Sequence, residues 1–264
     1  MTSEPNQNKK LFFLVAMPRS GNTLFASIMN QNKDLVVTAN SITLEIIKDL
    51  FLLKKIDVFQ NFPDHKSLDN VLDSVYDVFY KDWPQRIIID RGPVMTPGNF
   101  SLVQKHFKRP FKCIILVRDL MDVLGSYMKW YTENPNAFPN KFNLKNDEEK
   151  LLNIMKIGGA VAKELDAIKN AYNYPELCHF VKYDDMVTNP EQEFRKIYKF
   201  IEEPYFNHRF ENLDQINING LFYNDTAVGS NMHTVKEERI EKKYNPYIEK
   251  IPQKLKDMYA HIKF

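Results

Sequence analysis

The sequence predicts an α/β fold in which a mostly parallel central sheet is flanked by helices. Two observations lead to this prediction. Apolar runs of strand length recur along the chain, and the segments between them have helical periodicity. Strands that alternate with helices form right-handed βαβ units, which make the strands parallel. With 264 residues and 44% hydrophobic composition, the chain is long enough for a large core. We therefore expect a single domain over residues 1–264, with residues 1–10 flexible.

The elements follow in order from these patterns. The apolar runs that fit buried strands lie at residues 11–17, 35–38, 86–90, 112–117 and 177–183. Helical patterns begin at residue 23 and after residue 41, where Asn40 and Ser41 can cap a helix that runs to about residue 55. Further helices are expected at 68–81, 100–107, 122–130, 147–172, 190–201 and 248–261. We interpret the stretch 134–172 as a helical insertion in the same domain, and the pattern weakens over 202–247.

Composition excludes several functional classes. A net charge of +2 implies no general surface for nucleic acid. Cys113 and Cys178 lie in apolar runs, which predicts buried, reduced thiols in a reducing compartment. Neither cysteine has the neighbours of a metal site, and His106, which lies among lysines, is expected on the surface. The polar N-terminus and the short apolar run after it predict neither a signal peptide nor a membrane span.

The stretch at residues 11–30 carries the first functional signal. An apolar strand ends at Pro18, Gly21 allows a tight turn, and a helix follows. Such a turn directs free backbone N–H groups and the positive end of the helix dipole at one point, which favours an anion such as phosphate. An ordinary strand–turn–helix is the alternative. The residues expected to bind the anion are Arg19, Ser20, Gly21, Asn22, Thr23 and Leu24.

Other polar side chains follow later strands. Asp90 and Arg91 end the third predicted strand, Arg118 follows the fourth, and Tyr183 ends the fifth. Because the carboxyl ends of parallel strands meet at one edge of a sheet, where ligands bind, we expect these side chains near the turn.

The turn fits the nucleoside triphosphatase pattern G-x-x-x-x-G-K-(S/T) poorly. Ala16 replaces the first glycine, Asn22 replaces the lysine, and the cation has moved to Arg19. The segment P-R-S-G-N-T instead closely resembles the 5′-phosphosulfate loop, P-(K/R)-(S/T)-G-(T/N)-T, of sulfotransferases that use 3′-phosphoadenosine 5′-phosphosulfate (PAPS).

Two further segments resemble the same family. R-D-L-M-D-V-L-G-S, from Arg118 to Ser126, is similar to R-(D/N)-x-x-D-(V/A)-x-x-S, and the resemblance implies that Arg118 and Ser126 bind the 3′-phosphate of the donor. Taken alone, an ion pair of Arg118 with Asp119 or Asp122 is an equal alternative. The segment Y-D-D-M-V-T-N-P-E is similar to the family's Y-E-D-L and N-P-E, and implies that Tyr183 lies near the adenine or 3′-phosphate. With three matches in family order, the chain is identified as a member of the PAPS-dependent sulfotransferases.

Departures from the family concern the late loop and the base. The region of Ser230, Thr234 and Lys236 lacks the family's R-K-G, so Ser230 and Lys236 are predicted to bind the donor in its place, with a plain surface loop as the alternative. The histidine of the family's K-T-H is absent.

Some family members use a carboxylate as the base, and by analogy Glu45 or Asp90 is expected in that role here, although Asn40 lies nearer the expected position. Arg91 is expected to be the catalytic cation. The alternatives are a solvated Glu45 near Lys48 and a buried Asp90 paired with Arg19 or Arg91.

The resemblance implies transfer of a sulfuryl group from PAPS to a hydroxyl or amine by in-line displacement. The product of the donor is adenosine 3′,5′-bisphosphate (PAP), and the reaction is expected to need no metal. Catalysis is assigned to Arg19, Glu45, Asp90 and Arg91. The expected acceptor is a small molecule or carbohydrate, and the expected enzyme is cytoplasmic, with no membrane or nucleic-acid partner. The alternatives are a P-loop nucleotide kinase, since the strand ending at Asp90 passes as a Walker-B strand, and an inactive nucleotide-binding module.

Overall fold

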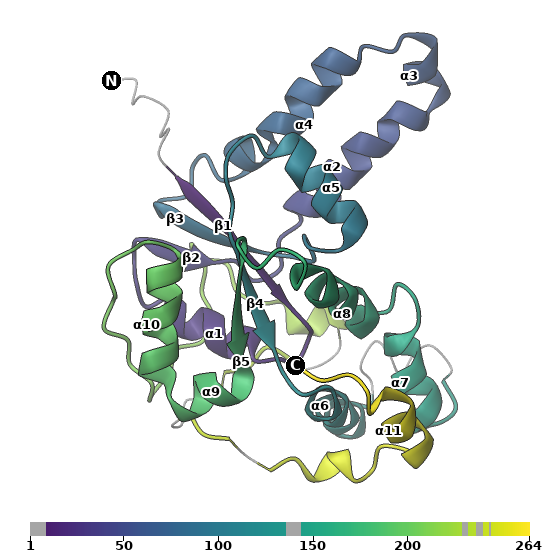
Figure 1. The fold of residues 1–264 in the computed structure, drawn as a ribbon, viewed down its shortest axis with the longest axis vertical. Coiled ribbons are helices and arrows are strands. Elements are labelled where there is room, and N and C mark those ends of the chain that lie inside the picture. The colour runs from purple at the N-terminus through teal and green to yellow at the C-terminus, as the bar shows by residue number, and fades with distance from the viewer. Residues whose placement is uncertain (1–8, 136–143, 229–231, 236–239, 243) are drawn as a thin grey trace.

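The fold is an α/β arrangement around one parallel sheet (Figure 1). The computed structural model describes residues 9–135, 144–228, 232–235, 240–242 and 244–264. In this part of the chain the five strands have the order β2-β3-β1-β4-β5, and every neighbouring pair is parallel. The strands are β1 (Lys10–Ala16), β2 (Leu35–Val37), β3 (Ile87–Arg91), β4 (Cys113–Val117) and β5 (Cys178–Lys182). The predicted fold class and strand positions are confirmed.

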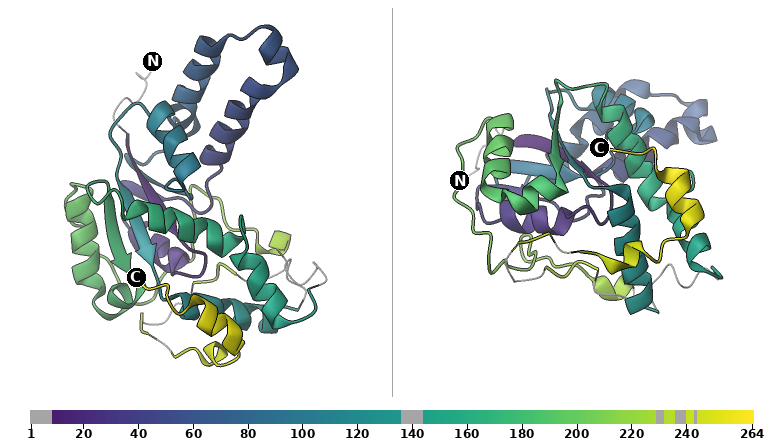
Figure 2. Two further views of the ribbon diagram at one scale, coloured as in Figure 1. Left: turned by 45° about the vertical axis from the view of Figure 1, so that its right-hand side comes forward. Right: turned by 60° about the horizontal axis from the view of Figure 1, so that its bottom comes forward.

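Helices cover both faces of the sheet and extend beyond it (Figure 2). They are α1 (Asn22–Met29), α2 (Thr43–Leu52), α3 (Asp57–Asn61), α4 (His65–Phe79), α5 (Pro97–His106), α6 (Leu120–Glu133), α7 (Asp147–Met155), α8 (Ala160–Ala171), α9 (Tyr183–Thr188), α10 (Pro190–Phe200) and α11 (Gln253–Tyr259). Short 3-10 turns are η1 (Leu53–Lys55), η3 (Asp225–Val228) and η4 (Pro246–Ile248). No helix in the described ranges is both long and apolar enough to cross a membrane.

Strand β1 is the centre of the core. Its residues from Leu11 to Ala16 are all buried, as expected for a strand with helices on both faces. Phe13 is fully buried, and its ring lies edge-on to Tyr76, Phe107 and Phe111 at centroid distances of 5.5, 5.6 and 5.5 Å. Burial of such a side chain contributes about 1.5–3 kcal/mol. The packing therefore holds the end of β1, and the loop after it, in a fixed place.

The connectivity turns at β1. From this strand the chain crosses to β2 and β3 on one side, and later to β4 and β5 on the other. In parallel sheets a ligand binds beyond the carboxyl ends of the strands where the direction of crossing changes. The loops after β1, β3, β4 and β5 all lie at that edge.

Helices α2 to α4 project from the sheet in every view (Figures 1 and 2).

The prediction that His106 lies on the surface is wrong. Its side chain is 1% exposed and its Nδ1 lies 2.8 Å from Asp73 Oδ1. The sequence misleads because the lysines around His106 face solvent while α5 turns the histidine toward α4.

The predicted helix 147–172 is two helices, α7 and α8. Gly158 has φ of 76°, and a Cβ on Gly159 would lie 2.5 Å from the carbonyl oxygen of Ile154, so the chain bends sharply there. Helix α8 packs on β1 and β4 and buries Val161, Leu165 and Ile168. Helix α8 is therefore part of the main core, and a single domain with a helical insertion over 134–172 stays a prediction.

The two cysteines are free and buried, as predicted. They face each other across β4 and β5. The segment after α10 contains little regular structure among its described residues and runs along α6 through η4.

Candidate functional site

The loop after β1 places a helix N-terminus at the ligand edge of the sheet. Gly21 precedes α1 with φ of 90°, and Arg19 has φ of 69°, so the loop turns through two left-handed residues. The first backbone hydrogen bond of the helix runs from Phe25 N–H to the Gly21 carbonyl. The N–H groups of Asn22, Thr23 and Leu24 therefore have no partner inside the helix. They and the helix dipole produce a positive field at the loop.

Gly21 is required by a close approach. A Cβ at this position would lie 2.7 Å from a ring carbon of Tyr183, in addition to the strain of a positive φ. The Tyr183 ring, at the start of α9, thus packs directly on the loop. The guanidinium of Arg118 lies over the same ring at 4.1 Å from its centroid.

Arg118 supports the loop from β4. Its Nη1 donates to the carbonyl of Arg19 at 2.8 Å. Asp119 instead caps α6 and accepts from the backbone N–H of Met121 at 2.8 Å. Burial raises the pKa of Asp122, and the charge of Arg118 opposes that rise. In the described part of the chain no ion pair joins Arg118 to Asp119, so Arg118 serves the loop and not the cap.

The Arg19 side chain bridges two remote segments. Its Nε donates to Ser126 Oγ in α6 at 3.0 Å, and its Nη1 donates to the carbonyl of Met232 at 3.1 Å. Burial lowers the pKa of Arg19, but a guanidinium remains charged. Three segments that the sequence separates widely, at Arg19, at Arg118 and Ser126, and at Tyr183, are therefore in mutual contact.

Buried polar atoms at this loop lack partners among the described residues. They are Ser20 Oγ, Asn22 Oδ1 and Arg118 Nε. Buried polar groups normally find a partner, and two of these three atoms are donors. Together with the free amides and two guanidinium groups, they fit an anion with several oxygen acceptors.

Arg91 lies at the end of β3. Its Nη1 donates to the Ala39 carbonyl at 3.1 Å and to Asn40 Oδ1 at 2.7 Å. Its charge also acts on Tyr127, Glu164 and Tyr223. Burial raises the pKa of Tyr127 to about 12, against the charges of Arg19 and Arg91. Both arginines thus lie close enough to one buried tyrosine to affect its pKa.

Asp90 is enclosed by hydroxyl groups. It is 2% exposed and accepts from Thr43 Oγ1 at 2.5 Å and from Thr38 Oγ1 at 3.4 Å. Complete burial raises its pKa, and the surrounding hydroxyls oppose the rise. A carboxylate sealed in this way has no route to the proton of an acceptor, so the geometry favours a structural role.

Glu45 lies in the first turn of α2 and is paired with lysines. Its side chain is 48% exposed, with Lys48 Nζ at 2.7 Å and Lys163 Nζ at 3.5 Å. The hydrogen bond from Lys48 lowers the pKa of Glu45. The solvated arrangement weighed as an alternative is the one found, and it makes Glu45 a weak base.

Glu164 is a buried carboxyl that the sequence did not indicate. This α8 residue is partly exposed as a whole, yet its Oε2 is buried and has no partner among the described residues. Burial raises the pKa of Glu164 to about 7, while the charges of Arg91 and Lys163 lower it. Its local sequence, A-K-E-L-D, looks like an ordinary exposed helix turn and contained no signal.

Asp225 and His233 were also missed. His233 Nδ1 lies 2.5 Å from Asp225 Oδ1, and the backbone N–H of His233 donates to Asp225 Oδ2 at 2.9 Å. The imidazole stacks on Tyr223 at a centroid distance of 3.7 Å and an interplanar angle of 2°. The predicted donor-binding residues Ser230 and Lys236 lie outside the described residues.

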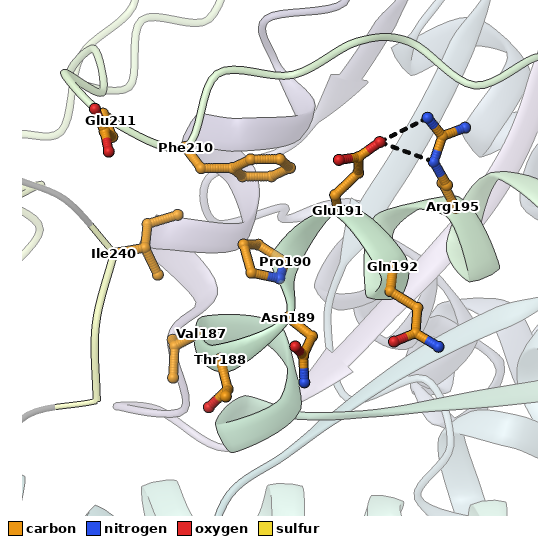
Figure 3. A pocket seen from close by; sticks show the side chains of 10 residues that line it. All are labelled: Val187, Thr188, Asn189, Pro190, Glu191, Gln192, Arg195, Phe210, Glu211 and Ile240. Atoms are coloured by element: carbon orange, nitrogen blue, oxygen red, sulfur yellow. Dashed lines mark hydrogen bonds and ion pairs between the residues drawn. The ribbon is translucent and has the colours of Figure 1, made fainter.

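A separate pocket lies where α9 meets α10 (Figure 3). Its lining includes Asn189, Arg195 and Phe210, and an ion pair of 2.6 Å joins Arg195 to Glu191. None of the predicted site residues lines it.

Among the residues that the structure describes, no cluster of three or more His, Cys, Asp or Glu side chains has the arrangement of a metal site.

A known protein family and several solved structures are similar to this chain over most of its length. The family model described as a sulfotransferase domain matches residues 9–250. A search of curated proteins found no match. Among solved structures, the sulfotransferase domain of the curacin biosynthetic pathway has a TM-score of 0.52 at 18% identity, with 100% of this chain and 93% of that chain covered.

Two further solved structures are similar in the same way. The sulfotransferase domain of the Synechococcus PCC 7002 olefin synthase gives a TM-score of 0.53 at 14% identity, covering 100% of this chain and 98% of that one. Mouse sulfotransferase SULT7A1 complexed with PAP has a TM-score of 0.53 at 16% identity, with 95% of this chain and 82% of that chain covered. At these identities the likeness concerns the fold.

Proposed function

The chain belongs to the sulfotransferase domain family, and we propose that it transfers a sulfuryl group from PAPS to a hydroxyl or amine of an acceptor, releasing PAP. One observation carries the proposal. Arg19, Ser126, Arg118 and Tyr183, which come from three distant segments, meet at a helix N-terminus that lacks a triphosphatase lysine. A fold neighbour from mouse is complexed with PAP, which supports the same class of donor here.

We assign the two phosphate groups of the donor to adjoining parts of the site. The amides of Asn22 to Leu24 and the Arg19 guanidinium bind the 5′-phosphosulfate. Arg118 and Ser126 bind the 3′-phosphate, and Tyr183 packs beside the adenosine. Because Arg118 already donates to the Arg19 carbonyl, binding at one phosphate position stabilises the loop that forms the other.

The proposed reaction is an in-line displacement at sulfur. A lone pair of the acceptor oxygen or nitrogen forms the new bond to sulfur, while the bond from sulfur to the bridging phosphate oxygen breaks and PAP leaves with that electron pair. The acceptor proton passes to a base. Negative charge develops on the sulfuryl and bridging oxygens, where Arg19, Arg91 and the helix amides stabilise it. Positioning of the two reactants contributes the rest.

Binding of PAP tests the donor assignment directly. PAP at 100 times its dissociation constant should add about 2.7 kcal/mol to the free energy of unfolding. For a chain of 264 residues that is a rise in Tm of about 5 °C, since the entropy of unfolding is about 2.1 cal/mol/K per residue. The rise should not require magnesium, and ATP with magnesium should give less.

Equal or greater stabilisation by ATP with magnesium would favour a nucleotide kinase and overturn the proposal. A chain that binds PAP but transfers no label from ³⁵S-PAPS to any alcohol, phenol or amine in a broad panel would be an inactive nucleotide-binding module.

A further inference from the structure

We propose that His233, held by Asp225, is the general base that removes the acceptor proton. The inference rests on the proposed sulfuryl transfer and adds a residue that neither the family pattern nor the strand ends indicate. It follows from the geometry of the described late segment, where an Asp–His pair lies beside the donor-binding cation.

The pair is oriented as a base requires. Asp225 Oδ1 lies 2.5 Å from His233 Nδ1, which fixes the proton on Nδ1 and leaves Nε2 as an acceptor. The second carboxylate oxygen accepts from the backbone N–H of His233, and Asp225 starts η3. The ring is stacked flat on Tyr223 at 3.7 Å. These contacts restrict the imidazole to one plane and one tautomer.

The pair is connected to the donor site through the chain. Met232, the residue before the histidine, accepts from Arg19 Nη1 at 3.1 Å, and the same guanidinium bonds to Ser126. The charges of Arg91 and Arg19 both act on the imidazole. The imidazole therefore lies near both arginines to which the proposed function assigns the transferred sulfuryl group.

The charge state suits the role. Burial lowers the pKa of His233, Asp225 raises it, and the two arginines lower it again, so the imidazole is neutral at pH 7 and able to accept a proton. When it does so, Asp225 stabilises the imidazolium. Of the two carboxylates that the sequence suggested, Asp90 is enclosed and Glu45 is paired in solvent.

The step balances without another reagent. As the acceptor heteroatom bonds to sulfur, its proton moves to His233 Nε2, and the bond from sulfur to the bridging oxygen breaks to release PAP. The imidazolium then loses its proton to solvent. Asp225 stays ionised and acts only as a positioning residue.

The first experiment replaces His233→Asn, which retains an amide near the Nδ1 position but removes Nε2. We expect PAP affinity within about twofold of wild type, and a loss of turnover with ³⁵S-PAPS of about 10²–10⁴-fold on any acceptor that the wild type uses. His261→Asn, which alters an exposed histidine near the C-terminus, is the matched control and should leave both unchanged. Turnover above a third of wild type, or an equal loss of PAP affinity, would show that His233 is not the base.

Asp225→Asn gives a second readout. The rate of a base-dependent step rises with pH through the pKa of the base, and loss of Asp225 should move that rise to lower pH because the carboxylate raises the histidine pKa. A profile unchanged in position would exclude the pair.

An NMR measurement on the folded wild type requires no acceptor. The ¹⁵N signals of His233, assigned by their loss in His233→Asn, should show the Nδ1–H tautomer and a higher pKa once PAP brings negative charge nearby. If PAP does not bind, the proposed function fails. If PAP binds and the His233 titration does not respond, only the base assignment fails.

Discussion

Replacement of Glu164 by glutamine should make the protein less sensitive to rising pH. Burial raises the pKa of this carboxyl to about 7, so between its ordinary value and pH 7 the folded state binds more protons than the unfolded state. Stability is then highest at low pH, where Glu164 is protonated, and falls as the pH rises through about 7. Glu164→Gln is neutral at every pH and lacks this loss.

The magnitude follows from the two pKa values. A rise from 4.5 to about 7 corresponds to about 3 kcal/mol at 1.36 kcal/mol per unit, an upper bound because the residue is partly exposed. For 264 residues this is at most about 6 °C in Tm.

The assay is a set of thermal melts of wild type and Glu164→Gln from pH 5 to pH 8. The Tm of the variant relative to wild type should increase from pH 5 to about pH 7, the range between the unfolded and folded pKa values, and level off above it. Glu45→Gln is the control: the Lys48 hydrogen bond lowers the pKa of Glu45, so its contribution is present above the ordinary carboxyl pKa and is lost only at lower pH. Its offset from wild type should stay flat from pH 5 to 8. A Glu164→Gln offset that is equally flat would refute the reasoning.

Three further predictions follow from the donor loop and the carboxylates. Arg118→Ala should weaken the binding of PAP by about 1.5–3 kcal/mol and the binding of adenosine 5′-phosphate much less. Calorimetry that finds equal losses of binding free energy for both ligands would make Arg118 purely structural. Gly21→Ala should destabilise the fold by about 1–3 kcal/mol and reduce PAP binding, because the new Cβ meets the Tyr183 ring; a Tm and PAP affinity equal to wild type would contradict that contact. Asp90→Asn should lower Tm and turnover together, since it breaks a buried hydroxyl network, whereas Glu45→Gln should leave turnover near wild type; a loss of turnover alone in either variant would restore that carboxylate as the base.

The loop after β1 shows how much of the structure a short stretch of sequence can predict. The apolar run before Pro18, the glycine at position 21 and the helix after it already imply a strand, a left-handed turn and a set of free amides. Because the carboxyl ends of parallel strands meet at one edge of the sheet, the sequence also predicts that Arg118 and Tyr183 lie near Arg19. The structure then joins them by a 2.8 Å hydrogen bond and a ring contact.

The carboxylates show where that reasoning stops. Asp90 and Glu45 sit at sequence positions that suit a base, yet one is enclosed by hydroxyls and the other is paired with lysines in solvent. A strand end or a first helical turn sets where a side chain starts. Its neighbours, and therefore its pKa and its access to a ligand, depend on elements that pack against it from elsewhere in the chain.

The sequence by itself determined the α/β fold, the positions of the strands along the chain and the strand–turn–helix with its free amides, because each depends on periodicity and turn chemistry within a few residues. Only the tertiary structure decided that His233 pairs with Asp225, that Glu164 has a buried oxygen and is affected by the charge of Arg91, and that α8 belongs to the core. The pair lies in a stretch with little regular structure, and Glu164 lies in a helix turn of ordinary composition. Burial and partners there result from packing between distant segments, which leaves no local pattern in the sequence.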